Sequence, residues 1–411
     1  MSFIKKSADI TPVIDTVFTV VSAATKAKQE HGIEKVCDAT IGSLYGEDGQ
    51  IVALKSVYDN YDTIPSRMKA KYAGGFKGNE NYREAMAKWV LRDNVHLPHS
   101  VIATPGGTGA VNLTIDLMLE TGQTLVIPQV AWGSYAVMAN NKGLQVEKYE
   151  LFEEDHFHLN SFKEVCSKVI KQQHKLVVVI NDPCHNPTGY SMTHQEWQAV
   201  IDYLNELSQE GEVVVLNDIA YLDYSFQRER ARDYMQVFNT INNKVLVVVA
   251  FSCSKALTSY GLRCGAAIIL GKEKEAVQVC EDCYAKAARA IWSNVNNSAM
   301  ENFVGVTQNR YEEYMAEKEG YIQLLEKRSS IVLQEAKECG LALYPFTEGF
   351  FVTVKLPDNQ TRDKYHELLC KNLIFTVKVN LGVRVGICSL NIEKCYGLAK
   401  RLKDILSEVE S

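Results

Sequence analysis

A lysine follows the apolar run "KVLVVV" (residues 244–249), in the stretch "AFSCSKALTSYGLRCG" that covers residues 250–265. Lys255 comes at the end of a segment with the pattern of a buried strand, and burial disfavours the charged form of an amine. Such a lysine either bends out to water or has a chemical purpose. In the second case it is an amine nucleophile, which attacks carbonyl carbons.

Polar groups also follow three other apolar runs. "PGGTG" (105–109) follows "VIAT", "NDPCHNPTG" (181–189) follows "KLVVVI", and "DIAY" (218–221) follows "EVVVLN". A glycine turn that opens a helix can hold a phosphate on its N–H groups, or it can simply join a strand to a helix. Asn186 before its proline also suits a tight turn. Asp218 needs a partner, because an unpaired buried carboxylate takes up a proton.

Taken together, these groups indicate one site. Ligands of open α/β sheets bind at the carboxyl ends of the strands, and Arg263 follows the lysine by eight residues. A compound with a phosphate, a protonated ring nitrogen, a phenolic oxygen and an aldehyde would satisfy all of these groups, and pyridoxal phosphate is such a compound. Lys255 would then be held as a Schiff base to the aldehyde. The glycine-rich segment "PGGTG" matches neither a Walker loop nor a G-x-G-x-x-G motif. The absence of the second motif argues against a nicotinamide-dependent dehydrogenase.

The elements that must position these residues alternate between strands and helices. Short, nearly continuous apolar runs such as "TLVIP", "KLVVVI" and "GAAIIL" are typical of strands covered on both faces. Amphipathic stretches between them, such as residues 193–212, are long enough for crossover helices. We therefore expect an α/β domain over residues 50–309, with a mainly parallel central sheet flanked by helices.

The rest of the chain has a different pattern. Residues 310–335 predict a long charged helix, "FFVTVKL" (350–356) alternates, and residues 391–409 predict a closing helix. These segments indicate a smaller α+β domain, discontinuous in sequence, formed by residues 1–49 and 310–411. A chain of 411 residues is long enough for two such domains.

Composition narrows the classes of partner. A net charge of −6 gives no reason to expect nucleic acid or an anionic membrane, and no apolar run is long enough to span a membrane. The start, "MSFIKKSADI", lacks the apolar centre of a signal peptide. Eleven scattered cysteines suit a reducing cytoplasm, and no metal site is expected, because the pair Cys280 and Cys283 has no second pair nearby.

In this order and spacing, the motifs resemble the fold-type I, pyridoxal-phosphate-dependent aminotransferases of class I/II, closest in pattern to the aspartate aminotransferases. The resemblance extends from about residue 41 to about residue 390. It implies that Lys255 binds the aldehyde and then moves a proton between the substrate Cα and the cofactor. It also implies that Asp218 pairs with the ring nitrogen, and that Asn186 and Tyr221 bond the phenolic oxygen.

Further cofactor contacts follow from the same resemblance. It implies that Trp132 in "VAWGSY" stacks on the ring, although its alternative is a core tryptophan. Tyr72 in "KYAGG" resembles the tyrosine that reaches the neighbouring subunit's phosphate, which implies a homodimer with shared active sites. Its glycine-rich surroundings also suit an ordinary loop. The implied phosphate site consists of Gly107, Thr108, Ser252 and Arg263.

Substrate recognition is implied by two arginines. Arg384 in "LGVRVGIC" matches the arginine that forks onto the substrate α-carboxylate, beside Asn186 and Gly42. Arg289 in "AARAIWSNVNN" resembles the arginine that crosses from the other subunit to a side-chain carboxylate, and its alternative is a solvated helix arginine. The implied reaction is ping-pong transamination between an L-amino acid (aspartate, glutamate or an aromatic one) and a 2-oxo acid.

The sequence departs from the aspartate-specific pattern. In that pattern, a histidine three residues after the stacking tryptophan supports the aspartate that pairs with the ring nitrogen, and here this position is Tyr135. The N-terminal loop "IGSLYGE", which borders the substrate in the family, is one residue longer. These departures leave the substrate open. Two other functions remain as alternatives, a carbon–sulfur β-lyase of the same fold and a non-enzymatic pyridoxal-phosphate-binding regulator. The regulator is disfavoured because no added DNA-binding segment is found.

Overall fold

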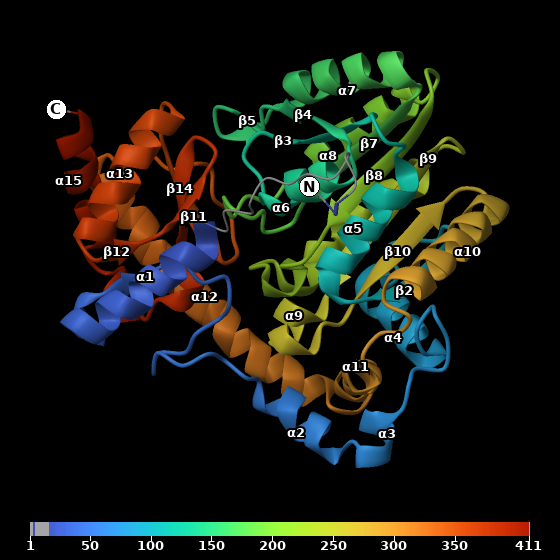
Figure 1. The fold of residues 1–411 in the computed structure, drawn as a ribbon, viewed down its shortest axis with the longest axis horizontal. Helices are drawn as coiled ribbons and strands as arrows, with labels where there is room; N and C mark the ends of the chain where they lie inside the picture. Colours follow the sequence, from blue (N-terminus) through green and yellow to red (C-terminus); the bar gives the residue numbers. More distant parts are fainter. Residues whose placement is uncertain (1–2, 5–15, 411) are drawn as a thin grey trace.

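A seven-stranded sheet forms the centre of the protein (Figure 1), for which a computed structural model describes residues 3–4 and 16–410. The strands lie in the order β2, β10, β9, β8, β7, β3, β4. Strands β9, β8, β7, β3 and β4 are parallel, and β10 is antiparallel to both of its neighbours. The predicted mainly parallel sheet is confirmed. The strands are β2 (His99–Thr104), β3 (Thr124–Pro128), β4 (Gln145–Tyr149), β7 (Lys175–Asn181), β8 (Glu212–Asp218), β9 (Val245–Ser252) and β10 (Gly265–Gly271).

Both faces of the sheet are covered by helices, which explains the continuous apolar runs. In β7, Val178 and Ile180 belong to one buried core, whereas Val177 and Val179 belong to the core on the opposite face. Successive side chains of a strand point to opposite faces, so a strand buried on both sides is apolar along most of its length. One face is covered by α5 (Gly106–Met118), α6 (Ser134–Asn141) and α10 (Lys274–Ile291), and the other by α4 (Glu80–Leu91), α7 (Leu159–Gln173), α8 (His194–Leu207) and α11 (Asn297–Asn309).

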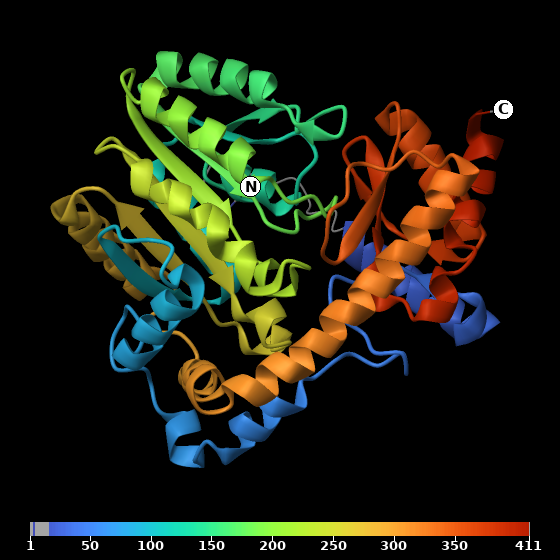
Figure 2. The same ribbon diagram turned by 180° about the vertical axis from the view of Figure 1, so that it is seen from behind.

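A second, smaller unit lies beside the large sheet (Figure 2). Its antiparallel sheet has the strand order β11, β14, β13, and a separate parallel pair joins β1 to β12. Its core is built from residues 37–39 and 332–406. The elements are β1 (Cys37–Asp38), β11 (Phe351–Lys355), β12 (Ile374–Phe375), β13 (Val377–Val379), β14 (Gly382–Gly386), α1 (Thr16–His31), α13 (Asn359–Lys371), α14 (Ile392–Cys395) and α15 (Leu398–Glu410).

The long helix α12 (Tyr311–Cys339) connects the two units (Figure 2). Tyr314 and Ile322 in its first part pack in the large core, and Val332 and Ala336 near its end pack in the small one. Because one continuous helix contributes to both cores, the domain boundary at residue 309 stays a prediction. The short remaining elements are α2 (Lys55–Thr63), α3 (Ser66–Ala70), α9 (Cys253–Ala256), β5 (Phe152–Glu153) and β6 (His156–Phe157).

The closing helix differs from the prediction. The segment predicted as one helix over residues 391–409 forms two helices, α14 and α15, which are separated by Tyr396 and Gly397. Gly397 has a φ of +71°, the left-handed conformation that ends a helix and that glycine adopts without strain. Within residues 3–4 and 16–410, no helix has the length and apolar character needed to cross a membrane.

Candidate functional site

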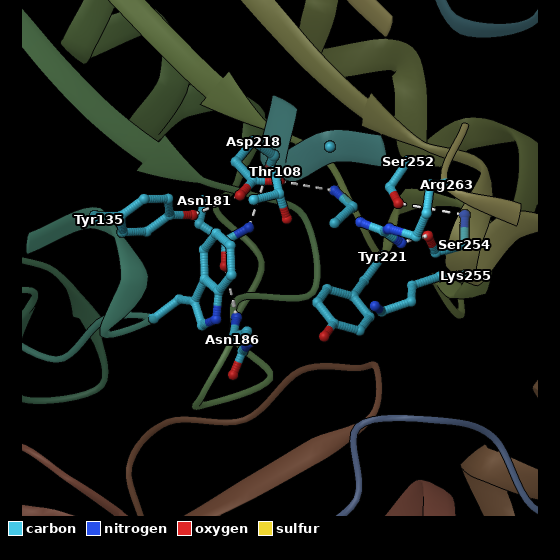
Figure 3. Close-up of a pocket in the computed structure, with 13 residues that line it drawn as sticks. Thr108, Tyr135, Asn181, Asn186, Asp218, Tyr221, Ser252, Ser254, Lys255 and Arg263 are labelled. Atoms are coloured by element: carbon cyan, nitrogen blue, oxygen red, sulfur yellow. Dashed lines mark hydrogen bonds between the residues drawn. The ribbon is translucent and has the colours of Figure 1, made fainter. Parts of the chain in front are cut away.

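A pocket lies where β7, β8 and β9 end and α5 begins (Figure 3). Parallel strands bring their carboxyl ends to one edge of the sheet, and the chain places its polar residues directly after those ends. The pocket is lined by Gly107, Thr108, Trp132, Tyr135, Asn181, Asn186, Asp218, Ala220, Tyr221, Ser252, Ser254, Lys255 and Arg263.

Lys255 lies in the single turn of α9, which follows β9 without a loop. Its Nζ atom is 5.5 Å from the ring centres of Tyr221 and Tyr260. Burial lowers the pKa of the amine to about 8, the positive charge of Arg263 adds to the shift, and Asp218 opposes it. The neutral, nucleophilic form of the amine is therefore a larger share near neutral pH than in an ordinary lysine.

Asp218 is the last residue of β8 and is 5% exposed. The Tyr135 hydroxyl donates a 2.6 Å hydrogen bond to its Oδ2, and the Ala220 amide donates a 3.1 Å bond to its Oδ1. Burial raises the pKa of the carboxyl, whereas these two donors and the charge of Lys255 lower it. The carboxylate has acceptor sites left for a further N–H donor.

Arg263, together with nearby serine hydroxyls and backbone amides, lies beside the start of α5. Arg263 Nη1 donates to Ser254 Oγ at 3.0 Å and to the Tyr260 carbonyl at 2.9 Å. Gly106 has a φ of +74°, and a Cβ built there would lie 2.6 Å from Arg263 Nη2. Gly107 and Thr108 are in the first turn of the helix, where free N–H groups and the helix dipole favour an anion.

Asn186 is held by contacts from both units. Its backbone amide donates to Asn181 Oδ1 at 2.7 Å, and its side-chain Oδ1 accepts a 3.2 Å bond from Arg384 Nη1. Asn181 in turn donates to the Asp218 carbonyl at 2.8 Å. The tight turn predicted around the proline contains a cis Asn186–Pro187 peptide bond. This loop thereby links the asparagine to the aspartate on the adjacent strand.

Arg384 is a buried cation whose contacts within the described residues are all to neutral groups. It lies in β14, donates to the Thr40 carbonyl at 2.9 Å, and stacks over Phe351 at 4.2 Å. Its Nε has no hydrogen-bond partner among the described residues. Gly42 lies near Phe351, because a Cβ added to it would be 3.5 Å from that ring. An unpaired guanidinium of this kind is suited to a carboxylate ligand.

The residues present fit pyridoxal phosphate. The cradle of Gly107, Thr108 and Ser252 with Arg263 matches a phosphate, and Gly106 leaves space that a Cβ would fill. Asp218 matches a protonated ring nitrogen, and the amine of Lys255 matches an aldehyde. Trp132 lines the same pocket, with its ring edge-on to Tyr135 at 5.3 Å, in reach of a planar ligand.

Four of the residues predicted for the site are not among those that line the pocket, namely Arg384, Gly42, Tyr72 and Arg289. Arg384 still contacts the pocket through Asn186, and Gly42 lies near Phe351, whereas the other two lie on the surface. Tyr72 is 82% exposed, and Arg289 is an exposed residue of α10 that contacts Ser293 and the Phe76 ring. Both were expected to act on a neighbouring subunit, so their distance from this pocket neither supports nor contradicts that role, which stays a prediction.

Sequence reasoning did not assign five residues of the site, namely Tyr135, which it noted only as a departure from the family pattern, and Asn181, Ala220, Ser254 and Tyr260. Asn181 directly follows the run "KLVVVI", and the rule that pointed to strand ends could have found it. Ser254 has a weaker signal, as the neighbour of Lys255. The roles of Ala220 and Tyr260 depend on a backbone amide and a ring face, which no residue pattern indicates.

Comparison with known proteins agrees with this geometry. The family model "Aminotransferase class I and II" matches residues 36–402. A solved aminotransferase from Anaerococcus prevotii is 31% identical with a TM-score of 0.95, and the match covers 98% of this chain and 99% of that one. An aspartate aminotransferase of Salmonella typhi is 28% identical over 46% of this chain, so the match spans only about half (47%) of that relative's length.

A third similarity concerns the fold alone. An aromatic-amino-acid aminotransferase from Burkholderia pseudomallei, solved covalently bound to pyridoxal phosphate, has a TM-score of 0.78 at 20% identity, with 99% of this chain and all (100%) of that one covered. The predicted fold class is thereby confirmed as fold type I. Because the family model matches residues 36–402 of its 411 residues, the chain belongs to the class I and II aminotransferases, a family that uses pyridoxal phosphate.

Proposed function

We propose that the protein transfers an amino group between an L-amino acid and a 2-oxo acid by a ping-pong mechanism that depends on pyridoxal phosphate. The observation that carries the proposal is the buried guanidinium of Arg384, which is bonded to Asn186 at the edge of the pocket that holds Lys255 and Asp218. An anion-binding arginine beside an amine nucleophile suits a substrate that bears both an amino group and a carboxylate.

When bound, pyridoxal phosphate supplies an aldehyde for the amino group and a ring that accepts electrons from the substrate Cα. The guanidinium of Arg384, whose Nε has no partner among the described residues, would bind the α-carboxylate and so orient the amino acid. The neutral Nζ of Lys255 would take the proton from Cα and deliver it to the cofactor carbon that carried the aldehyde, and with the 2-oxo acid it would move a proton in the reverse direction. Asp218 would hold a proton on the ring nitrogen, and Asn186 and Tyr221 would bond the phenolic oxygen. Gly107, Thr108, Ser252 and Arg263 hold the phosphate.

The side chain of the preferred amino acid is the less determined part of the proposal. Aspartate, glutamate or an aromatic amino acid each fit the similarities to aspartate and aromatic-amino-acid aminotransferases. Arg289 would favour the acidic substrates if a second copy of the chain brings it to this pocket. A homodimer in the cytoplasm, without nucleic acid or membrane as partner, completes the proposal.

The test is the absorption spectrum of the purified holoenzyme, recorded before and after addition of single L-amino acids. We expect the band of the lysine-bound cofactor to give way to that of its amine form, and 2-oxoglutarate to restore the first band. The Lys255→Ala variant should bind the cofactor but not turn over. Normal turnover by that variant would exclude the proposed role of the lysine.

The β-lyase alternative predicts a different result in the same experiment. A lyase releases ammonia and pyruvate without consuming a 2-oxo acid, and the band of the lysine-bound cofactor persists. We favour transamination because the matching family model is that of aminotransferases and the relatives similar to this chain are aminotransferases. Absence of any cofactor band after addition of pyridoxal phosphate would contradict both functions.

A further inference from the structure

Tyr135 is hydrogen-bonded to the carboxylate of Asp218. It is the second residue of α6, its side chain is fully buried, and its hydroxyl lies 2.6 Å from Asp218 Oδ2 (Figure 3). The ring belongs to the core beneath the sheet, and it packs edge-on against Trp132 at an interplanar angle of 88°. These contacts fix the direction of the hydroxyl, so it is aimed at the carboxylate before any ligand binds.

We propose that Tyr135 is a positioning residue, which keeps Asp218 ionised and directs it at the ring nitrogen of the cofactor. This inference rests on the proposed function. It assigns to a phenol the support that the resembled aspartate aminotransferases draw from a histidine.

A phenol differs from an imidazole in its protonation. It has a single O–H proton, which it can only donate to a carboxylate, whereas an imidazole can donate, accept or carry a charge. Burial first, and the adjacent charge of Asp218 second, raise the pKa of Tyr135 well above its usual value. The tyrosine is therefore a neutral donor at neutral pH and well above it.

The geometry at Asp218 shows what the donor accomplishes. Tyr135 occupies Oδ2 and the Ala220 amide occupies Oδ1, so each oxygen has one donor and the carboxylate cannot rotate freely. Both bonds stabilise the ionised form against the effect of burial. Without the hydroxyl, Asp218 would lose one of its two described donors, so burial would leave a larger share of it protonated and unable to accept from a ring N–H.

The experiment measures cofactor affinity of the apoenzyme, by fluorescence or calorimetric titration, with two ligands. One is pyridoxal phosphate, and the other is its 1-deaza analogue, in which a carbon replaces the ring nitrogen. The variant Tyr135→Phe keeps the ring and its packing against Trp132. We expect it to weaken binding of pyridoxal phosphate about tenfold or more, the effect of losing a hydrogen bond to a charged group. Binding of the deaza analogue should change less than about twofold, because that analogue offers no proton to Asp218.

A matched control removes a different buried hydroxyl. Tyr284 is fully buried in the same core, and its hydroxyl donates to Thr114 Oγ1 at 3.0 Å, without contact to Asp218. Tyr284→Phe should leave the affinity for both ligands unchanged. In an Asp218→Asn background, Tyr135→Phe should likewise have little effect on pyridoxal phosphate, since the charge that it supports is gone.

The outcomes separate this inference from the proposed function. Equal weakening of both ligands would show that Tyr135 only supports packing, and unchanged affinity would show that its bond has no effect; either result overturns the inference while the proposed function stands. If the wild-type apoenzyme bound no pyridoxal phosphate, the proposed function would fail, and this inference with it.

Discussion

Replacement of Arg384 by lysine tests the recognition of the substrate carboxylate. Arg384 donates from Nη1 to Asn186 and from Nη2 to Thr40, and it stacks over Phe351. Lysine keeps the positive charge but loses the planar fork, so it can form one of the two carboxylate bonds and not both. The lost bond to a charged group is worth about 1.5–3 kcal/mol. We therefore expect kcat/KM for L-amino acids to fall about ten- to hundredfold in Arg384→Lys.

The assay uses the holoenzyme and compares two substrates with the same side chain. One is the L-amino acid, and the other is the amine that remains when its carboxylate is removed. The rate of conversion of the cofactor band gives kcat/KM for each. The substitution should affect the amine less than about twofold, because nothing on that substrate reaches Arg384. The exposed Arg401 of α15, mutated to lysine, is the control for changes elsewhere in the small unit.

Two results would refute this reasoning. An equal loss for the amino acid and for the amine would mean that Arg384 maintains the structure of the site, through Asn186, and does not bind the carboxylate. A loss below about twofold for both would mean that the carboxylate is recognised elsewhere.

Three further predictions follow from the site and its support. Gly106→Ala should weaken the binding of pyridoxal phosphate about tenfold in a titration, because the new Cβ would lie 2.6 Å from Arg263 Nη2. The control Gly133→Ala should leave the affinity unchanged, because the space around that position is open. When the apoenzyme reacts with pyridoxal phosphate and borohydride traps the product on Lys255, the rate of capture should rise with pH through about 8, because Lys255 loses its proton there. A midpoint near the usual pKa of 10.5 would contradict the lowered pKa. Asp223→Asn should reduce the free energy of unfolding in urea by about 3–5 kcal/mol, since buried Arg232 and Lys318 lose their shared carboxylate. A loss below about 1 kcal/mol, similar to that of the partly exposed Asp59→Asn, would contradict this.

Much of the fold and of the pocket could be predicted from local patterns. Continuous apolar runs indicated strands buried on both faces, and β7, β8 and β9 lie where those runs are. In a parallel sheet the ends of such strands meet, so Asn186, Asp218 and Lys255 had to come close to one another. Their side chains line one pocket. Local patterns also misled at residues 396–397, where a single left-handed glycine divides the closing helix.

Other parts of the site depend on contacts between distant segments. The hydroxyl of Tyr135 meets Asp218 because α6 packs against the sheet, and the sequence alone left the effect of that tyrosine open. Arg384 reaches Asn186 from a separate antiparallel sheet, although 198 positions separate the two in the chain. Whether Tyr72 and Arg289 complete the site in a second copy stays a prediction.

The sequence by itself determined which groups stand at the ends of the strands, and therefore the chemistry of the pocket. Only the tertiary structure decided which donor holds Asp218, how the small unit presents Arg384, and which surfaces lie apart from the pocket. The physical reason is one of range. Strand ends and turns are encoded by a few adjacent residues, whereas the placement of one unit against another results from many weak packing contacts between residues far apart in the chain.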